Sequence, residues 1–101
     1  MQKTDIMVLC AHPGILATLV RLVNNNIQWQ ATGFGAVADA ITASGDKPYK
    51  LALLGSGFSA RDELLLTGAL QHLPVIKHYG GGSGLLNAEV YAGLAQAEAT
   101  F

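Results

Sequence analysis

The stretch GDKPYKLALLGSGFSA, residues 45–60, places an apolar run between a polar loop and an abrupt glycine turn. The run LALL within it carries no polar side chain. A short, continuously apolar segment between turn residues is typical of a strand that is buried on both faces of a parallel sheet. We therefore predict a central strand over Lys50–Leu54 that stops at Gly55, a residue with no side chain.

Apolar or alternating runs predict three further strands around this one. The predicted strands are Ile6–Ala11, Ile27–Thr32, Lys50–Leu54 and Pro74–Tyr79. The second run, IQWQAT, alternates apolar and polar residues, which is typical of a half-exposed or edge strand. The spacing of apolar residues and the helix-end signals predict a helix after each strand, at Ile15–Asn24, Ala36–Ser44, Ser59–Leu70 (with Ser59 as N-cap) and Leu85–Ala99.

This repeated β-α alternation predicts a single α/β domain over residues 1–101. Short loops and right-handed crossovers then require a parallel sheet with helices on both faces. We predict a three-layer, doubly wound, flavodoxin-like fold with four strands in the order 2-1-3-4.

The composition excludes several classes of partner. Half of the 101 residues are hydrophobic and 13% are charged, which supports a sizeable core. The net charge is −1 without a run of like charge, so we predict neither a nucleic-acid nor a membrane partner. The single cysteine, Cys10, excludes an internal disulfide and favours a reducing compartment, the cytoplasm.

Candidate site residues follow from the predicted topology. In a doubly wound fold, ligands bind outside the carboxyl ends of the strands, where the strand order reverses. Here that point lies between the first and third strands. The residues that follow the first, third and fourth strands are Cys10, Ala11, His12, Gly55, Ser56, Gly57, His78, Tyr79 and the glycine loop Gly80–Gly84.

Cys10 is the one candidate nucleophile among these residues. It precedes a predicted helix, and the amides at a helix N-terminus stabilise anions such as a thiolate. A thiolate there could attack a substrate or carry a phosphoryl group. We favour a buried core cysteine, because free cysteine is among the most buried residue types.

Anion binding is a second open possibility at this edge. The GGGSG segment precedes a helix but lacks the lysine of a Walker A loop, and glycine-rich turns more often only solve a backbone problem. The possible anion or ligand contacts are His12, Ser56, His78, Gly81, Gly82 and Ser83. His12 and His78 belong to separate strands and no metal-ligand spacing occurs, so we predict no metal and no cofactor.

Four segments resemble response-regulator receiver domains in their order and spacing. They are VLCAHPGILATLVRLV (Val8–Val23), QATGFGAVADAI (Gln30–Ile41), KPYKLALLGSG (Lys47–Gly57) and PVIKHY (Pro74–Tyr79). The resemblance covers nearly the whole chain. It implies a receiver fold and a role in two-component signal transduction through a protein partner.

The chain departs from receivers at the positions that support phosphorylation. Cys10 and Ala11 stand where receivers carry a metal-binding acid pair, and Gly55 stands where they carry the aspartate that accepts the phosphoryl group. Tyr79 or a neighbour falls where receivers place a threonine or serine, and no fifth β-α unit is predicted. Magnesium needs oxygen ligands and phosphoryl acceptance needs a carboxylate. The resemblance therefore implies a degenerate receiver, a non-enzymatic regulatory module that is not phosphorylated on aspartate.

A weaker resemblance links the chain to the IIB components of the lactose/cellobiose phosphotransferase systems. It is carried by IMVLCAHPG (Ile6–Gly14) and LALLGSG (Leu51–Gly57). It implies that Cys10 is a phosphocysteine and that the protein is a phosphoryl carrier in sugar uptake. The loop after Cys10 suits this function poorly, because Pro13 removes an N–H donor and no hydroxyl occurs before Thr18.

The absence of a predicted fifth unit leaves the fourth strand at an edge of the sheet. That strand is apolar at Pro74, Val75 and Ile76, and Lys77 within it suits an edge position. The last helix carries further apolar residues, namely Leu85, Leu86, Val90, Tyr91 and Leu94. Apolar edges invite pairing with another chain, so we predict a two-fold homodimer built on the fourth strand and the last helix.

Overall fold

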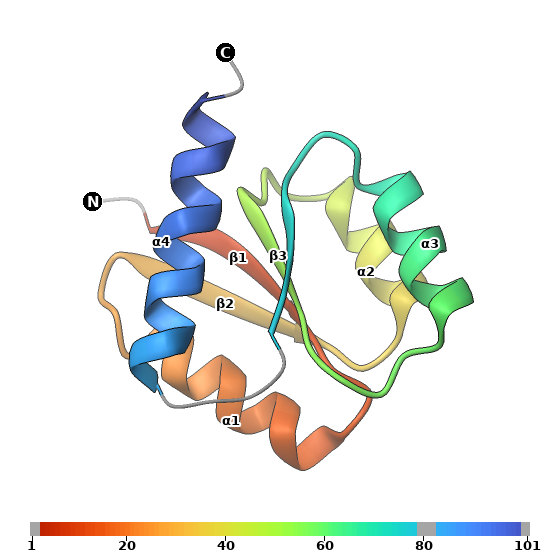
Figure 1. Cartoon of the computed structure of the whole chain (residues 1–101), viewed down its shortest axis with the longest axis horizontal. Coiled ribbons are helices and arrows are strands. Elements are labelled where there is room, and N and C mark those ends of the chain that lie inside the picture. Colours follow the sequence, from red (N-terminus) through yellow and green to blue (C-terminus); the bar gives the residue numbers. More distant parts are fainter. Residues whose placement is uncertain (1–2, 79–82, 100–101) are drawn as a thin grey trace.

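A computed structural model of the chain describes residues 3–78 and 83–99. Four strands form one parallel sheet in the order β2-β1-β3-β4, and four helices cover it (Figure 1). The elements are β1 (Thr4–Leu9), α1 (Pro13–Asn24), β2 (Trp29–Phe34), α2 (Val37–Ser44), β3 (Leu51–Leu54), α3 (Ala60–Ala69), β4 (Val75–Lys77) and α4 (Ser83–Ala99). The predicted α/β class, strand order and parallel pairing are confirmed.

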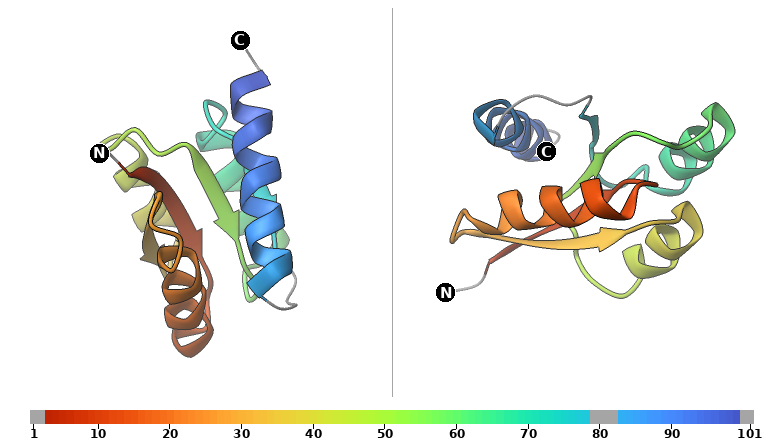
Figure 2. Two further views of the ribbon diagram at one scale, coloured as in Figure 1. Left: turned by 90° about the vertical axis from the view of Figure 1, so that its left-hand side faces the viewer. Right: turned by 90° about the horizontal axis from the view of Figure 1, so that it is seen from below.

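The sheet separates two layers of helices, with α1 and α4 on one face and α2 and α3 on the other (Figure 2). Each layer buries its own apolar cluster, because successive residues of a strand point to opposite faces. The first core contains Ile6, Val8, Cys10, Leu19, Val23, Trp29, Leu51, Leu53, Leu86 and Val90. The second core contains Met7, Leu9, Val37, Ala40, Tyr49, Ala52, Leu54, Leu66, Leu70 and Leu73.

The decisive apolar run forms β3, as predicted. It lies between β1 and β4, and all four of its residues are buried. Leu53 of β3 pairs with Val8 of β1 on one side and with Ile76 of β4 on the other. Burial on both faces explains why no polar side chain interrupts this strand.

Two strand boundaries differ from the predictions at the first half of the chain. The first strand is Thr4–Leu9 rather than Ile6–Ala11, and the second is Trp29–Phe34 rather than Ile27–Thr32. A turn delays the second strand: the amide of Trp29 donates to the carbonyl of Asn26, and Ile27 is 83% exposed. The edge position predicted for this strand is confirmed.

Two helices begin earlier than their apolar periodicity predicts, whereas the second begins at Val37 rather than Ala36 and the third follows its predicted N-cap, Ser59. The first begins at Pro13 rather than Ile15, because proline at the first helical position has a fitting φ and needs no hydrogen-bond donor. The last begins at Ser83 rather than Leu85, so Ser83 and Gly84 belong to α4 and not to the glycine loop. The fourth strand is shortened to Val75–Lys77.

The last helix lies on an unexpected side for a helix that would lead to a fifth strand. While the chain moves from β2 to β3 and on to β4, its crossover helices α2 and α3 stay on one face of the sheet. A right-handed crossover to a strand beyond β4 needs its helix on that same face. Instead α4 packs against β3, β4 and α1, on the opposite face. It closes the first core, and β4 stands at the edge of the described sheet.

Candidate functional site

The carboxyl ends of β1 and β3, where the sequence places the site, are joined by backbone contacts. The amide of Gly55 donates to the carbonyl oxygen of Leu9 at 2.6 Å, and the amide of Ala11 donates to that of Ser56 at 3.1 Å. The thiol Sγ of Cys10 lies 3.5 Å from the same Ser56 oxygen. The loops that follow the two strands are therefore held together by their own backbones, and we call this contact the β1–β3 junction.

Gly55 has no room for a side chain in this backbone. A Cβ atom there would lie 2.8 Å from the carbonyl oxygen of Leu9 and 3.4 Å from the Sγ of Cys10. The first contact is with backbone, so it cannot be relieved by turning a side chain. An aspartate at this position, where receivers carry their phosphoryl acceptor, would require the two strand ends to move apart.

Gly57 closes the same junction by a different means. Its φ is +99°, a left-handed conformation that side chains rarely adopt. A Cβ atom there would lie 2.6 Å from the Cβ of Ala11 and 3.1 Å from Nε2 of His12. The turn after β3 thus presses its backbone directly against the loop after β1.

Cys10 lies inside the first core with 0% of its surface exposed. Its location fits the buried core cysteine that we favour from the sequence. The predicted alternative, a reactive thiolate at the start of α1, requires access that the folded chain does not give to this side chain.

The two candidate histidines have different surroundings. His12 is the exposed N-cap residue of α1, and its ring lies beside Gly57. His78 is 5% exposed; its Nδ1 contacts a carboxylate oxygen of Glu89 on α4, and its amide donates to the carbonyl of Leu54. The described contacts of His78 therefore point to α4 and β3, and do not bring it to His12.

The glycine-loop candidates are only partly described. Tyr79, Gly81 and Gly82 lie outside the described residues, and Ser83 is the first residue of α4. Ser56 is exposed, and its carbonyl oxygen accepts the contacts from Ala11 and Cys10. Anion binding by these residues stays a prediction.

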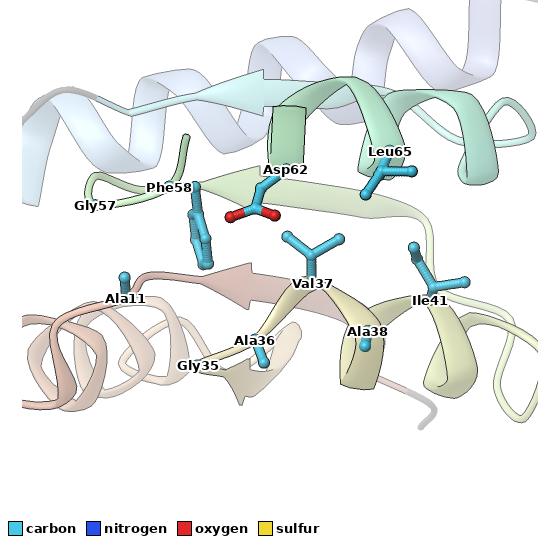
Figure 3. A pocket seen from close by; sticks show the side chains of 10 residues that line it. All are labelled: Ala11, Gly35, Ala36, Val37, Ala38, Ile41, Gly57, Phe58, Asp62 and Leu65. Carbon is cyan, nitrogen blue, oxygen red and sulfur yellow. The ribbon is translucent and has the colours of Figure 1, made fainter. Parts of the chain in front are cut away.

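A cavity opens beside the closed junction, between α2 and α3 (Figure 3). Its volume is about 470 Å³. Its walls are largely apolar and come from Ala11, Gly35, Ala36, Val37, Ala38, Ile41, Gly57, Phe58, Asp62 and Leu65. Of the predicted site residues that the structure describes, only Ala11 and Gly57 line it.

The contribution of β2 and α2 to this cavity was missed at the sequence level. The predicted site used only the residues after the first, third and fourth strands. A signal was available, because β2 neighbours β1 and its carboxyl end must reach the same edge of a parallel sheet. The small residues Gly35 and Ala36, between β2 and α2, leave that edge open.

Among the described residues that line the cavity, Asp62 alone carries a charge. Ser59 caps α3 by accepting a hydrogen bond from the amide of Asp62 at 3.1 Å, which fixes the first turn of the helix. The Asp62 carboxylate then points between Phe58 and Val37 (Figure 3). The site is therefore an apolar cavity with one acidic group at its wall.

The described ranges, 3–78 and 83–99, contain no group of three or more His, Cys, Asp or Glu side chains that could hold a metal ion. In the same ranges, no helix combines the length and the apolar character that crossing a membrane requires.

Two solved structures with the same architecture are described as signal receiver domains. One, from an HD domain-containing protein of Pseudomonas fluorescens Pf-5, has a TM-score of 0.64 at 11% sequence identity and covers 94% of this chain and 72% of its own. Another, from a protein of Vibrio parahaemolyticus described as a Luxo repressor, has a TM-score of 0.58 at 10% identity and covers 98% and 95%. No protein-family model and no curated protein matches the chain. The likeness to these structures shows that the chain has the fold of a signal receiver domain.

Proposed function

We propose that this chain is a signalling module of the receiver type that acts through contacts with protein partners and is not phosphorylated on aspartate. The observation that carries the proposal is the packing at Gly55. The position that would bear the phosphoryl acceptor lacks a side chain, and a Cβ atom there would lie 2.8 Å from the carbonyl oxygen of Leu9.

The neighbouring positions support the same proposal. Cys10 and Ala11 replace the acid pair that would bind magnesium, and magnesium is held by oxygen ligands. Cys10 is also fully buried. The module is thus proposed to be non-enzymatic and, with one reduced cysteine, to work in the cytoplasm.

The burial of Cys10 also counts against the function of a phosphocysteine carrier. Such a carrier must present its thiolate to a donor and an acceptor protein in turn. Here the Sγ is enclosed by the first core and lies 3.5 Å from the carbonyl oxygen of Ser56. A phosphoryl group on this sulfur would have no space without opening the β1–β3 junction.

Incubation with a small phosphodonor and magnesium tests both functions together. We expect the intact mass of the protein to stay unchanged, in the native chain and in Cys10→Ser alike. A phosphate adduct that disappears in Cys10→Ser would establish the carrier function instead. An adduct that survives in Cys10→Ser would reveal another acceptor and contradict the proposed lack of phosphorylation.

Self-association through β4 and α4 is part of the proposal. The outer edge of β4 faces away from the described sheet, and Leu85 and Tyr91 of α4 are exposed. Since α4 lies on the α1 face, a right-handed crossover through it cannot cover this edge. Lys77 forms an ion pair with Glu63 at 2.8 Å, which draws its charge toward α3.

Sedimentation equilibrium of the native chain and of Leu85→Glu tests this interface. We expect a dimer whose dissociation constant rises at least about tenfold in Leu85→Glu, since the substitution puts a charge where the dimer would bury a leucine. Leu64→Glu on α3 is the matched control and leaves the dimer unchanged. A native chain that stays monomeric at high concentration excludes the dimer.

A further inference from the structure

The outer side of α3 carries large apolar side chains that the core does not use. Leu66 and Leu70 are buried in the second core, whereas Leu64 is 72% exposed and Leu65 is 53% exposed. A single exposed leucine needs no explanation, but neighbouring ones beside a cavity are typical of an interaction surface. The helix is therefore apolar on two sides.

One of these two exposed leucines belongs to the apolar wall of the cavity between α2 and α3. Leu65 lines the cavity on the α3 side, and Val37 and Ile41 line it on the α2 side (Figure 3). Leu64, the preceding residue of α3, is exposed outside the lining. An occupant that covers the whole apolar surface must therefore fill the cavity and also extend over the outer side of α3.

The two neighbouring acids of α3 differ in their partners. Glu63 pairs with Lys77 of β4. Within the described part of the chain, the Asp62 carboxylate has no hydrogen-bond or ion-pair partner, although the backbone amide of Asp62 is capped by Ser59. The cavity lining, as far as the structure describes the chain, includes no residue with a positive charge. A cation supplied by another molecule would complement this carboxylate.

We propose that the cavity between α2 and α3 docks a segment of a different protein, in which an apolar side chain lies one helical turn from a lysine or arginine. The apolar side chain enters between Val37, Ile41 and Leu65, and the cation reaches Asp62. This assignment rests on the proposed function as a protein-interaction module, and it names the surface and the chemistry of the partner.

The shape and charge of the surface favour this occupant over two others. A small ligand held within the cavity would leave Leu64 exposed. A second copy docking through its α4 would bring Leu85 and Tyr91 but no cation, because Ser83–Ala99 contains neither lysine nor arginine. A basic amphipathic segment supplies both the apolar and the charged contact.

Amide NMR of the 15N-labelled chain with synthetic peptides tests the docking surface. The probe is a helical peptide of about 18 residues, long enough to be helical in water, with a leucine stripe flanked by lysines. Matched peptides replace each lysine by glutamate or each leucine by serine. We expect saturable shifts confined to α2 and α3 with the leucine–lysine peptide, and at least about tenfold weaker binding of both matched peptides.

Two surface variants locate the contacts. Asp62→Asn should weaken the binding of the leucine–lysine peptide about fivefold, the upper range for an exposed ion pair. It should not weaken the binding of the glutamate peptide, because the substitution removes a contact between like charges. Leu65→Ser should weaken the binding of the leucine–lysine peptide at least about tenfold. Leu85→Ser on α4 is the control and should bind as the native chain does. Thermal unfolding of each variant confirms that it is folded.

Several outcomes would overturn the inference. Three concern the peptides: no saturable shifts at millimolar peptide, shifts centred on α4, or equal affinity for the lysine and glutamate peptides. A fourth is a set of concentration-dependent shifts of α2 and α3 without peptide, which would identify a second copy of the chain as the occupant. Phosphate incorporation does not depend on this surface. Loss of peptide binding together with an unchanged mass would therefore reject the docking surface and leave the proposed function intact.

Discussion

The β1–β3 junction and the cavity between α2 and α3 lie at the same edge of the sheet but use small residues in opposite ways. At Gly55 and Gly57 the missing side chains let two backbones meet, and the junction is closed. At Gly35, Ala36 and Ala38 the small side chains leave space, and a cavity opens. Small residues at the carboxyl edge of a sheet therefore indicate a site only when the backbones around them stay apart.

The largest expected effect comes from placing an aspartate at the β1–β3 junction, and an aspartate beside the cavity is its control. Gly55→Asp should lower the free energy of unfolding by about 3 kcal/mol or more, because its Cβ would press on a backbone oxygen and its carboxylate would be buried at the junction. Gly35→Asp, whose Cβ meets nothing within 4 Å, should change it by less than about 1 kcal/mol. Urea denaturation measures both, and equal stabilities would mean that the junction is not closed.

Two glycine-to-alanine substitutions, one in the turn after β3 and one in α1, are expected to change stability in opposite directions. Gly57→Ala should cost about 2 kcal/mol, from its φ of +99° and its contact with Ala11. Gly14→Ala in α1 has open space and should stabilise the protein by up to about 1 kcal/mol, since alanine favours helix. Differential scanning calorimetry gives the sign of each change, and a stabilising Gly57→Ala would contradict the close approach.

Ser56 and Ser59 flank the turn after β3, and replacing each by alanine compares a serine that acts through its backbone with one that acts through its hydroxyl. Ser59→Ala should lower the free energy of unfolding by about 1 kcal/mol, because it removes the cap of α3. Ser56→Ala should change it by less than about 0.5 kcal/mol, because its described contacts are made by its carbonyl oxygen. Urea denaturation compares the pair, and a Ser56→Ala cost as large as that of Ser59→Ala would reveal a role for the Ser56 hydroxyl.

The smallest effect on stability is expected inside the cavity. Ala38→Leu should change the free energy of unfolding by less than about 0.5 kcal/mol, because the new side chain extends into open space from a helix. Ala40→Leu on the same helix is the control and should cost about 1–3 kcal/mol, because Ala40 is packed in the second core. If Ala38→Leu also leaves the affinity for the leucine–lysine peptide unchanged, that peptide does not enter the cavity.

Local patterns in the sequence were sufficient to predict the architecture. The continuous apolar run at Leu51–Leu54 and the alternation around Trp29 correctly predicted a central and an edge strand. With one helix between successive strands, right-handed crossovers leave few ways to order the sheet. The errors lie at element ends, where Pro13 and Ser83 begin helices ahead of the first apolar residues.

The candidate site was less predictable because it depends on distances between elements. The sequence shows that Gly55 has no side chain, but only the hydrogen bond from its amide to Leu9 shows that none would fit. The cavity depends on how far α2 stands from α3, and no pattern within either helix reports that distance. The different partners of Asp62 and Glu63 likewise cannot be predicted from the sequence, because they depend on the position of Lys77 in β4, which pairs with Glu63.

The position of α4 on the α1 face affects the order in which the two cores can form during synthesis. The buried residues of the second core all come from Met7 to Leu73, and Val75 of β4 also packs against them. The first core also needs Leu86 and Val90. The ring of Tyr91 meets that of Trp29 edge-on, and its hydroxyl accepts a hydrogen bond from the side chain of Asn26, 65 residues away in sequence. During synthesis on the ribosome, the chain therefore contains every buried residue of the second core before the helix that covers Trp29 has been made.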